Sequence, residues 1–150
     1  SDLGSFTQEI LDEQSWPEEI ALELNLTAGL VVAVDPERLR RAFINVFSNA
    51  VQSFTGEKRG DEKLSITLLP AGKRVQLVVM DNGSGISDEV MPRIFEPMFS
   101  TKNFGVGLGM AIVKNIMEEQ GGGVEIVSQP GRGTSVTLCL PRYYNVSGSD

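Results

Sequence analysis

The segment from Asp35 to Gly56 places the strongest constraint on the fold, because it carries a complete amphipathic helix pattern. Asp35 suits the N-cap, and Pro36 suits the first helical position, where its missing N–H costs nothing. The apolar residues that follow at helical spacing are Leu39, Phe43, Val46, Phe47, Ala50 and Phe54. At about 100° per residue they share one sector of the helix, whereas Asn45 and Asn49 lie on a separate polar flank. One face can therefore pack on a core while another meets a ligand.

Strand patterns on both sides of this helix predict an α+β domain. We expect a helix over residues 5–14 with Ser5 as its N-cap, and another over 108–120 that ends at three glycines. The expected strands cover residues 20–26, 31–34, 64–69, 75–80, 124–127 and 134–140. Adjacent strands with few helices favour a largely antiparallel sheet covered by helices on one face. We assign residues 1–19 to a helix and linker from a preceding domain, 20–144 to the folded domain and 145–150 to a polar tail.

Composition limits the chemistry that this domain can carry. The 150 residues suit one ordinary domain, and a net charge of −7 argues against broad nucleic-acid binding, which needs clustered Lys and Arg. The absence of histidine excludes His-based acid–base chemistry, His metal sites and an in-chain phosphohistidine. The only cysteine, Cys139, falls in an alternating strand pattern and is expected to be a buried thiol. No run approaches the ~20 apolar residues of a membrane span, so we expect a cytoplasmic domain of a parent that is either soluble or membrane-anchored.

Two polar segments have features of a binding site, and each also has an ordinary structural interpretation. Asp81 ends an expected strand and precedes Asn82-Gly83-Ser84-Gly85, so its carboxylate can accept a hydrogen bond from an exocyclic amine while the glycines allow close approach. The same residues are also ordinary turn chemistry. Asn45 and Asn49 stand at i and i+4, so both amide oxygens can converge on one Mg²⁺. Asparagines are also common on a solvated helix flank.

A glycine-rich turn precedes the last expected helix. Gly105-Val-Gly-Leu-Gly109 would present backbone N–H groups and the helix dipole to phosphate. It matches neither the dinucleotide-binding G-x-G-x-x-G nor the P-loop pattern, and the protein-kinase catalytic loop needs a histidine that this chain lacks. In the preceding loop, Ser100, Thr101 and Lys102 offer donors and a positive charge that suit polyphosphate, and the glycines would act as lid hinges. A solvated lysine is the alternative.

Taken in order, these segments resemble the N, G1, F and G2 boxes of the GHKL ATP-binding superfamily. The boxes are Asn-x-x-x-Asn on a helix, D-x-G-x-G after a strand, an F-x-P-F-like loop beginning at Phe95, and G-x-G-x-G before a helix, within roughly residues 20–141. The chain is most similar to the catalytic ATP-binding domain of two-component sensor histidine kinases, in the nitrogen-regulator-like subgroup. The resemblance implies a two-layer α/β sandwich, with a mixed, mainly antiparallel sheet and helices on one face, that binds ATP and Mg²⁺.

The resemblance also implies a role for each box. Asp81 would take the adenine amino group in a base pocket shaped by Gly83 and Gly85. Asn49, with Asn45 beside it, would hold Mg²⁺. Lys102 would reach the terminal phosphates. The other nucleotide contacts that the resemblance implies are Ile86, Phe95, Thr101, Gly105, Gly107, Leu108, Gly109 and Thr134, the last through water.

Three positions bear on the activity. Where many family members place a basic residue and an aromatic after Asn49, this chain has Gln52 and Ser53, so we transfer phosphate contact to Lys102. Chaperone, topoisomerase and mismatch-repair members resemble one another in having Glu at position 45 as a general base, whereas Asn45 cannot accept the proton. We therefore expect a histidine protein kinase with poor ATP hydrolysis, and Asn45 and Lys102 as its catalytic residues.

The expected phosphate acceptor is a histidine on a separate dimerisation domain, because this chain has none. We expect that domain and a response regulator receiver domain as partners, and contact with neither nucleic acid nor membrane. The chain alone should bind ATP without phosphorylating itself. Two alternatives stay open: a GHKL-type serine kinase or anti-sigma-like regulatory module, and an interaction domain that binds no nucleotide.

Overall fold

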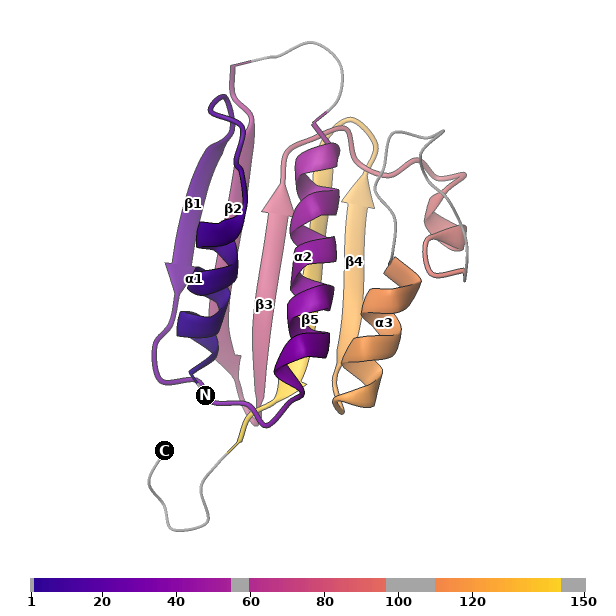
Figure 1. The fold of residues 1–150 in the computed structure, drawn as a ribbon. Helices are drawn as coiled ribbons and strands as arrows, with labels where there is room; N and C mark the ends of the chain where they lie inside the picture. Colours follow the sequence, from indigo (N-terminus) through magenta and orange to yellow (C-terminus); the bar gives the residue numbers. More distant parts are fainter. Residues whose placement is uncertain (1, 55–59, 97–109, 144–150) are drawn as a thin grey trace.

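The computed structural model describes residues 2–54, 60–96 and 110–143, which form two layers (Figure 1). The helices in these ranges are α1 (Leu3–Glu13), α2 (Pro36–Gln52), the 3₁₀ helix η1 (Met91–Arg93) and α3 (Met110–Glu119). The strands are β1 (Ala21–Leu26), β2 (Lys63–Ala71), β3 (Arg74–Asp81), β4 (Gly123–Gln129) and β5 (Gly133–Pro141). The three α-helices cover the same face of the sheet, with α2 across its middle (Figure 1). The predicted two-layer sandwich is confirmed.

The five strands form one mixed sheet in the order β1-β2-β3-β5-β4. β1 and β2 are parallel, because the chain returns through α2 before it re-enters the sheet in the same direction. The other neighbouring pairs are antiparallel, as predicted. In this register Asp81 lies opposite Thr134, and Thr134 lies opposite Ser128. The ends of β3, β5 and β4 therefore bring three polar residues into one row.

α2 forms as its sequence predicts. Asp35 caps the helix by accepting hydrogen bonds from the N–H groups of Glu37 and Arg38, at 3.0 and 3.4 Å. The helix ends at Gln52, and Ser53 is its C-cap. Its buried residues are Leu39, Ala42, Phe43, Val46, Phe47 and Ala50. The apolar sector read from the sequence is thus the face that packs on the sheet.

The start of α1 and the segment after β1 differ from the prediction. Asp2, and not Ser5, is the N-cap of α1, and its second carboxylate oxygen accepts a hydrogen bond from the Gly29 N–H at 2.9 Å. The predicted strand over residues 31–34 is wrong, since Val31 forms only an isolated bridge with Asp2. The long-range contact with Asp2 holds this segment beside α1, so it does not join the sheet.

α1 packs into the same hydrophobic core as the rest of the domain. Ile10 and Leu11 are 0% and 2% exposed, and the Phe6 ring meets the Phe43 ring of α2 with centroids 5.9 Å apart. Arg40 of α2 also forms an ion pair with Glu13. The core thus extends without interruption from α1 to the sheet.

The opposite face of the sheet has no helix over it in the described part of the chain (Figure 1). Strand alternation places half-buried polar side chains there, among them Thr67 and Gln76. Cys139 lies on this face beside Gln76 and is half-buried, so the prediction of a buried thiol is wrong. None of the described helices has both the length and the apolar character needed to cross a bilayer.

Candidate functional site

A buried carboxylate stands at the end of β3. Asp81 is 7% exposed, and its carboxylate accepts a hydrogen bond from the Gly83 N–H at 2.9 Å. The Ser53 hydroxyl is close by and donates its own hydrogen bond to the Ala50 carbonyl oxygen at 2.7 Å. Burial is the largest influence and raises the pKa of Asp81, while the nearby Gly83 N–H, Ser53 hydroxyl and Thr134 N–H act in the opposite direction. An ionised carboxylate has about four acceptor positions, so the hydrogen bond from Gly83 leaves capacity for an N–H group of a ligand.

The loop after Asp81 lies tightly against the end of α2 and the β4–β5 turn. A Cβ on Gly83 would lie 2.3 Å from Ser53 Oγ, and one on Gly85 (φ +74°) would lie 2.2 Å from the Gln129 carbonyl oxygen. A side chain at either position would displace neighbouring atoms. The two glycines therefore allow the loop to pack closely against Ser53 and Gln129 at the rim of the site.

These elements surround a small cavity of about 30 Å³ on the helix-covered face of the sheet, with room for about one water. The predicted contacts that line it are Asn49, Asp81, Gly85, Ile86 and Thr134. The other lining residues are Ser53 and the apolar Val46, Ala50, Val79, Ile94, Met110, Ile126 and Val136. An apolar wall with a few polar groups is typical of small-molecule sites.

Asn49 supplies an unsatisfied polar group to this wall. Its Nδ2 atom is buried and has no hydrogen-bond partner among the residues that the structure describes. Leaving a buried donor unpaired costs about 1–3 kcal/mol, so a polar ligand here would relieve that cost. A turn of the amide exchanges its oxygen and nitrogen, so the residue can offer oxygen to Mg²⁺ or N–H to phosphate. Asn45 is half-buried but does not line the cavity, so the structure brings only one of the two asparagines to Asp81.

Other predicted contacts lie away from the cavity or outside the described residues. Phe95 is half-buried at the edge of the core, where Lys114 Nζ lies 5.2 Å from its ring centroid. Gly83 packs behind the cavity against Ser53. The predicted contacts outside the described residues are Thr101, Lys102, Gly105, Gly107, Leu108 and Gly109.

Sequence reasoning gave no site role to two serines that the structure places here. Ser53 is 5% exposed, lines the cavity and meets Asp81, although its sequence signal was only the replacement of a family aromatic. Ser128 accepts a hydrogen bond from the Ile86 N–H at 2.7 Å. One feature of the sequence could have indicated Ser128. Strand alternation in β4 places it on the same face of the sheet as Ile126, which lines the cavity.

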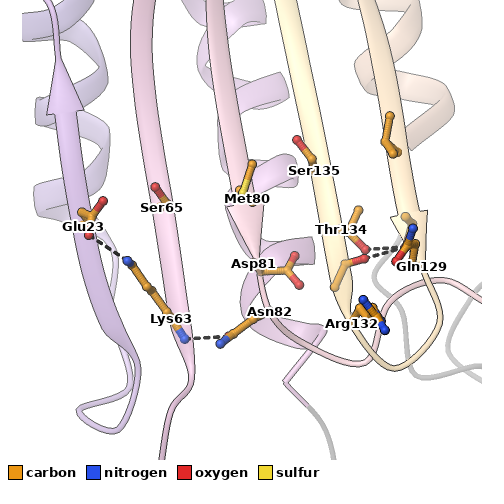
Figure 2. Close-up of a pocket in the computed structure, with 13 residues that line it drawn as sticks. Glu23, Lys63, Ser65, Met80, Asp81, Asn82, Gln129, Arg132, Thr134 and Ser135 are labelled. Carbon is orange, nitrogen blue, oxygen red and sulfur yellow. Dashed lines mark hydrogen bonds and ion pairs between the residues drawn. The ribbon is translucent and has the colours of Figure 1, made fainter.

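A larger hollow of about 550 Å³ lies on the uncovered face of the sheet (Figure 2). It shares Asp81 and Thr134 with the smaller cavity, because both residues stand where the strands end. Apart from Asp81, its charged side chains are exposed, and Lys63 pairs with Glu23 at 2.9 Å. We assign the site to the smaller cavity, because that one contains the unpartnered amide together with the buried carboxylate.

Comparison with known proteins identifies the family. The sequence model of the histidine kinase-, DNA gyrase B-, and HSP90-like ATPase family matches residues 34–144. The chain therefore belongs to this family, whose members bind ATP. Within the family, it is an ATP-binding catalytic domain of the sensor histidine kinase type.

The chain is similar to sensor histidine kinases and to a nitrogen regulation protein. It is 39% identical over 110 residues to the sensor histidine kinase ZraS of Escherichia coli (strain K12), covering 73% of this chain and 23% of that protein. It is 31% identical over 126 residues to the nitrogen regulation protein NtrY of Azorhizobium caulinodans, covering 81% and 16%. Its fold matches the catalytic domain of the histidine kinase ThkA with a TM-score of 0.79, at 27% identity and with 95% and 93% covered. The predicted resemblance is confirmed, and the chain spans less than a quarter of these two curated relatives.

Proposed function

We propose that this chain donates the γ-phosphate of ATP to a histidine on a separate dimerisation domain. The observation that carries the proposal is the meeting of Asp81 and Asn49 at one cavity, where the carboxylate keeps acceptor capacity and the amide has no partner within residues 2–54, 60–96 and 110–143. The similarity to sensor histidine kinases supports the type of acceptor. The chain contains no histidine, so the acceptor must come from another segment or protein.

Each polar group has a proposed role. Asp81 would accept a hydrogen bond from the exocyclic amine of adenine. The apolar wall would move apart and pack on the base, because the cavity itself has room for only about one water. Asn49 would hold Mg²⁺ through its amide oxygen, which suits an ion that takes few protein ligands. Bound Mg²⁺ would neutralise phosphate charge during phosphoryl transfer. Lys102, with Thr101 and the glycine-rich turn at 105–109, would contact the phosphates.

Asn45 supports phosphate donation over hydrolysis. An amide cannot take a proton from water as a glutamate can, so this position supplies no general base. We expect slow release of inorganic phosphate from ATP by the chain alone. A steady hydrolysis rate that Asn45→Ala abolished would contradict this role.

Calorimetric titration tests the site. Wild-type protein should bind Mg-ATP, and Asp81→Ala and Asn49→Ala should each weaken binding by about tenfold or more, because each loses an interaction with a charged group. Asp88→Ala and Asn115→Ala are matched controls, since both side chains are exposed and away from the cavity. Equal affinities of the site and control variants would reject the assignment.

Phosphotransfer tests the activity. With γ-labelled ATP, the chain alone should stay unlabelled, whereas adding a separate histidine-bearing dimerisation domain should label that domain. Label on this chain, or on a serine of the added protein, would contradict a histidine kinase function. We also propose a response regulator receiver domain as the next acceptor and the cytoplasm, where ATP is abundant, as the place of action.

A further inference from the structure

A row of three polar side chains crosses the sheet at the candidate site. Asp81 on β3 lies opposite Thr134 on β5, which lies opposite Ser128 on β4. Asp81 and Thr134 line the cavity on the helix-covered face, whereas Ser128 does not reach it. Any influence of Ser128 on a ligand must therefore pass through its neighbours.

The hydroxyl of Ser128 makes three contacts that together determine where its proton lies. Its Oγ accepts a hydrogen bond from the Ile86 N–H at 2.7 Å, donates one to the Gly133 carbonyl oxygen at 3.1 Å, and lies 2.8 Å from Thr134 Oγ1. A hydroxyl has one proton and two lone pairs. Because a carbonyl oxygen can only accept, the contact with Gly133 uses the Ser128 proton. The contact with Thr134 then requires Thr134 to donate.

This arrangement determines what Thr134 shows to the cavity. With its proton directed to Ser128, Thr134 Oγ1 keeps only lone pairs for a ligand. Asp81, the neighbouring polar group, is also an acceptor when ionised. The edge of the cavity formed by β3 and β5 therefore offers acceptors on both residues.

We propose that Ser128 is a positioning residue that determines nucleotide specificity, because it orients the Thr134 hydroxyl as an acceptor. An adenine edge with an exocyclic amine satisfies this surface. A guanine edge places a carbonyl oxygen where adenine has its exocyclic amine. This oxygen would face the Asp81 and Thr134 acceptors, and neither would donate a proton to it. The proposal rests on the proposed binding of ATP at this site.

A purely structural role for Ser128 makes a different prediction. The hydrogen bond from Ile86 also anchors the loop after Asp81 to β4. Losing only that anchor would weaken ATP and GTP binding by the same factor. Losing the orientation of Thr134 frees its proton to turn into the cavity, which weakens ATP binding and improves GTP binding. The ratio of the two dissociation constants separates these cases.

The test is calorimetric titration of the full chain with Mg-ATP and with Mg-GTP. In Ser128→Ala, the preference for ATP over GTP should fall by about five- to tenfold, the worth of one neutral hydrogen bond. Ser128→Thr, which keeps the hydroxyl, should retain the wild-type preference. If Ser128→Ala does not fold, Ser128→Cys carries the same test, because a thiol is a weak hydrogen-bonding group of similar size.

A double-mutant cycle with Thr134→Val shows whether Ser128 acts through Thr134. In the Thr134→Val background, Ser128→Ala should leave the ATP-to-GTP preference unchanged. An equal loss of both affinities in Ser128→Ala, or a changed preference in the Thr134→Val background, would overturn the proposal. Wild-type protein that binds neither nucleotide would instead reject the proposed function, so the two failures are distinguishable.

Discussion

Asp81 accepts a hydrogen bond from the Gly83 N–H in a place where burial disfavours its charge. Such a group contributes less to folding than an exposed carboxylate does, because its desolvation opposes its hydrogen bonds. Perturbed groups of this kind cluster at functional sites, where a ligand completes their interactions. We therefore expect Asp81 to lower the stability of the free protein and a bound nucleotide to restore that stability.

The free energy of unfolding of Asp81→Asn, relative to that of wild type, should increase as pH rises. The pKa of Asp81 in the folded state is raised above the ordinary 3.8, so the folded protein binds this proton more tightly than the unfolded chain does. The free energy of unfolding of wild type therefore falls as pH rises from 3.8 through the folded-state pKa. Asparagine does not titrate. Denaturant unfolding at several pH values, followed by the fluorescence of Trp16, measures the difference.

The control for this titration is Asp88→Asn, at an exposed position. Its stability relative to wild type should not depend on pH in this way. A difference between Asp81→Asn and wild type that stayed constant across the same pH range would show that burial does not perturb Asp81. The same variant should bind Mg-ATP more weakly, because a neutral amide oxygen is a weaker acceptor than a carboxylate.

Gly83→Ala should destabilise the protein by about 1–3 kcal/mol, the usual cost of forcing an extra methyl group into a packed site. Its Cβ would lie 2.3 Å from Ser53 Oγ and 2.6 Å from the Ser53 carbonyl oxygen. Gly123→Ala is the matched control, since its Cβ would have no neighbour within 4 Å. Denaturant midpoints compare the two variants. Equal midpoints would mean that the loop after Asp81 moves away from α2 at little cost.

At the scale of elements, α1 is fastened to α2 by packing and charge. Ile10 and Leu11 are buried, and the Trp16 indole N–H donates a hydrogen bond to the Leu11 carbonyl oxygen at 2.9 Å. The Trp16 ring also lies against Phe47, with centroids 6.3 Å apart. Because α2 carries Asn49, support of α2 by α1 helps to position the site.

The division into residues 1–19, 20–144 and 145–150 stays a prediction.

Ile10→Ala should lower the free energy of unfolding by about 2–5 kcal/mol, as for other large-to-small changes in a core. Ile10 is 0% exposed, whereas Ile112 on α3 is 36% exposed and provides a control in the same helical setting. Ile112→Ala should cost much less, because little buried surface is lost. Unfolding curves that matched for the two variants would show that α1 detaches from the core without affecting it.

At the scale of the whole molecule, the cavity lies where α2, α3, β3, β4 and β5 meet. A ligand there contacts elements that are far apart in the sequence, from Asn49 on α2 to Thr134 on β5. Binding should therefore stabilise the domain as a unit, and only the folded chain should bind tightly. The stabilisation follows mass action and depends on ligand concentration.

Mg-ATP at a hundred times its dissociation constant should stabilise wild-type protein by about 2.7 kcal/mol. Asn49→Ala should lose the part of this effect that depends on Mg²⁺, measured as the difference in melting temperature with ATP before and after addition of a chelator. Asn115→Ala should keep it, because this asparagine is exposed on α3. A full Mg²⁺-dependent shift in Asn49→Ala would show that another group holds the ion.

Local patterns were sufficient to predict much of this architecture. Asp35 and Pro36 identified the start of α2, and the spacing of its apolar residues identified its buried face. The same local reasoning was wrong where a distant partner intervenes. Ser5 is a reasonable N-cap by residue type, but Asp2 takes that role because it also reaches Gly29. Short patterns do not contain such partners.

By itself, the sequence determined the ATP-binding family, the amphipathic face of α2 and the carboxylate that ends β3, since each depends on residue types at fixed short spacings. Only the tertiary structure decided which polar groups share a cavity. It brings Asn49 to Asp81 and leaves Asn45 aside, because the docking of α2 on the sheet sets which part of its polar flank faces β3. It also places Ser128 beside Thr134, a contact that exists only through strand register.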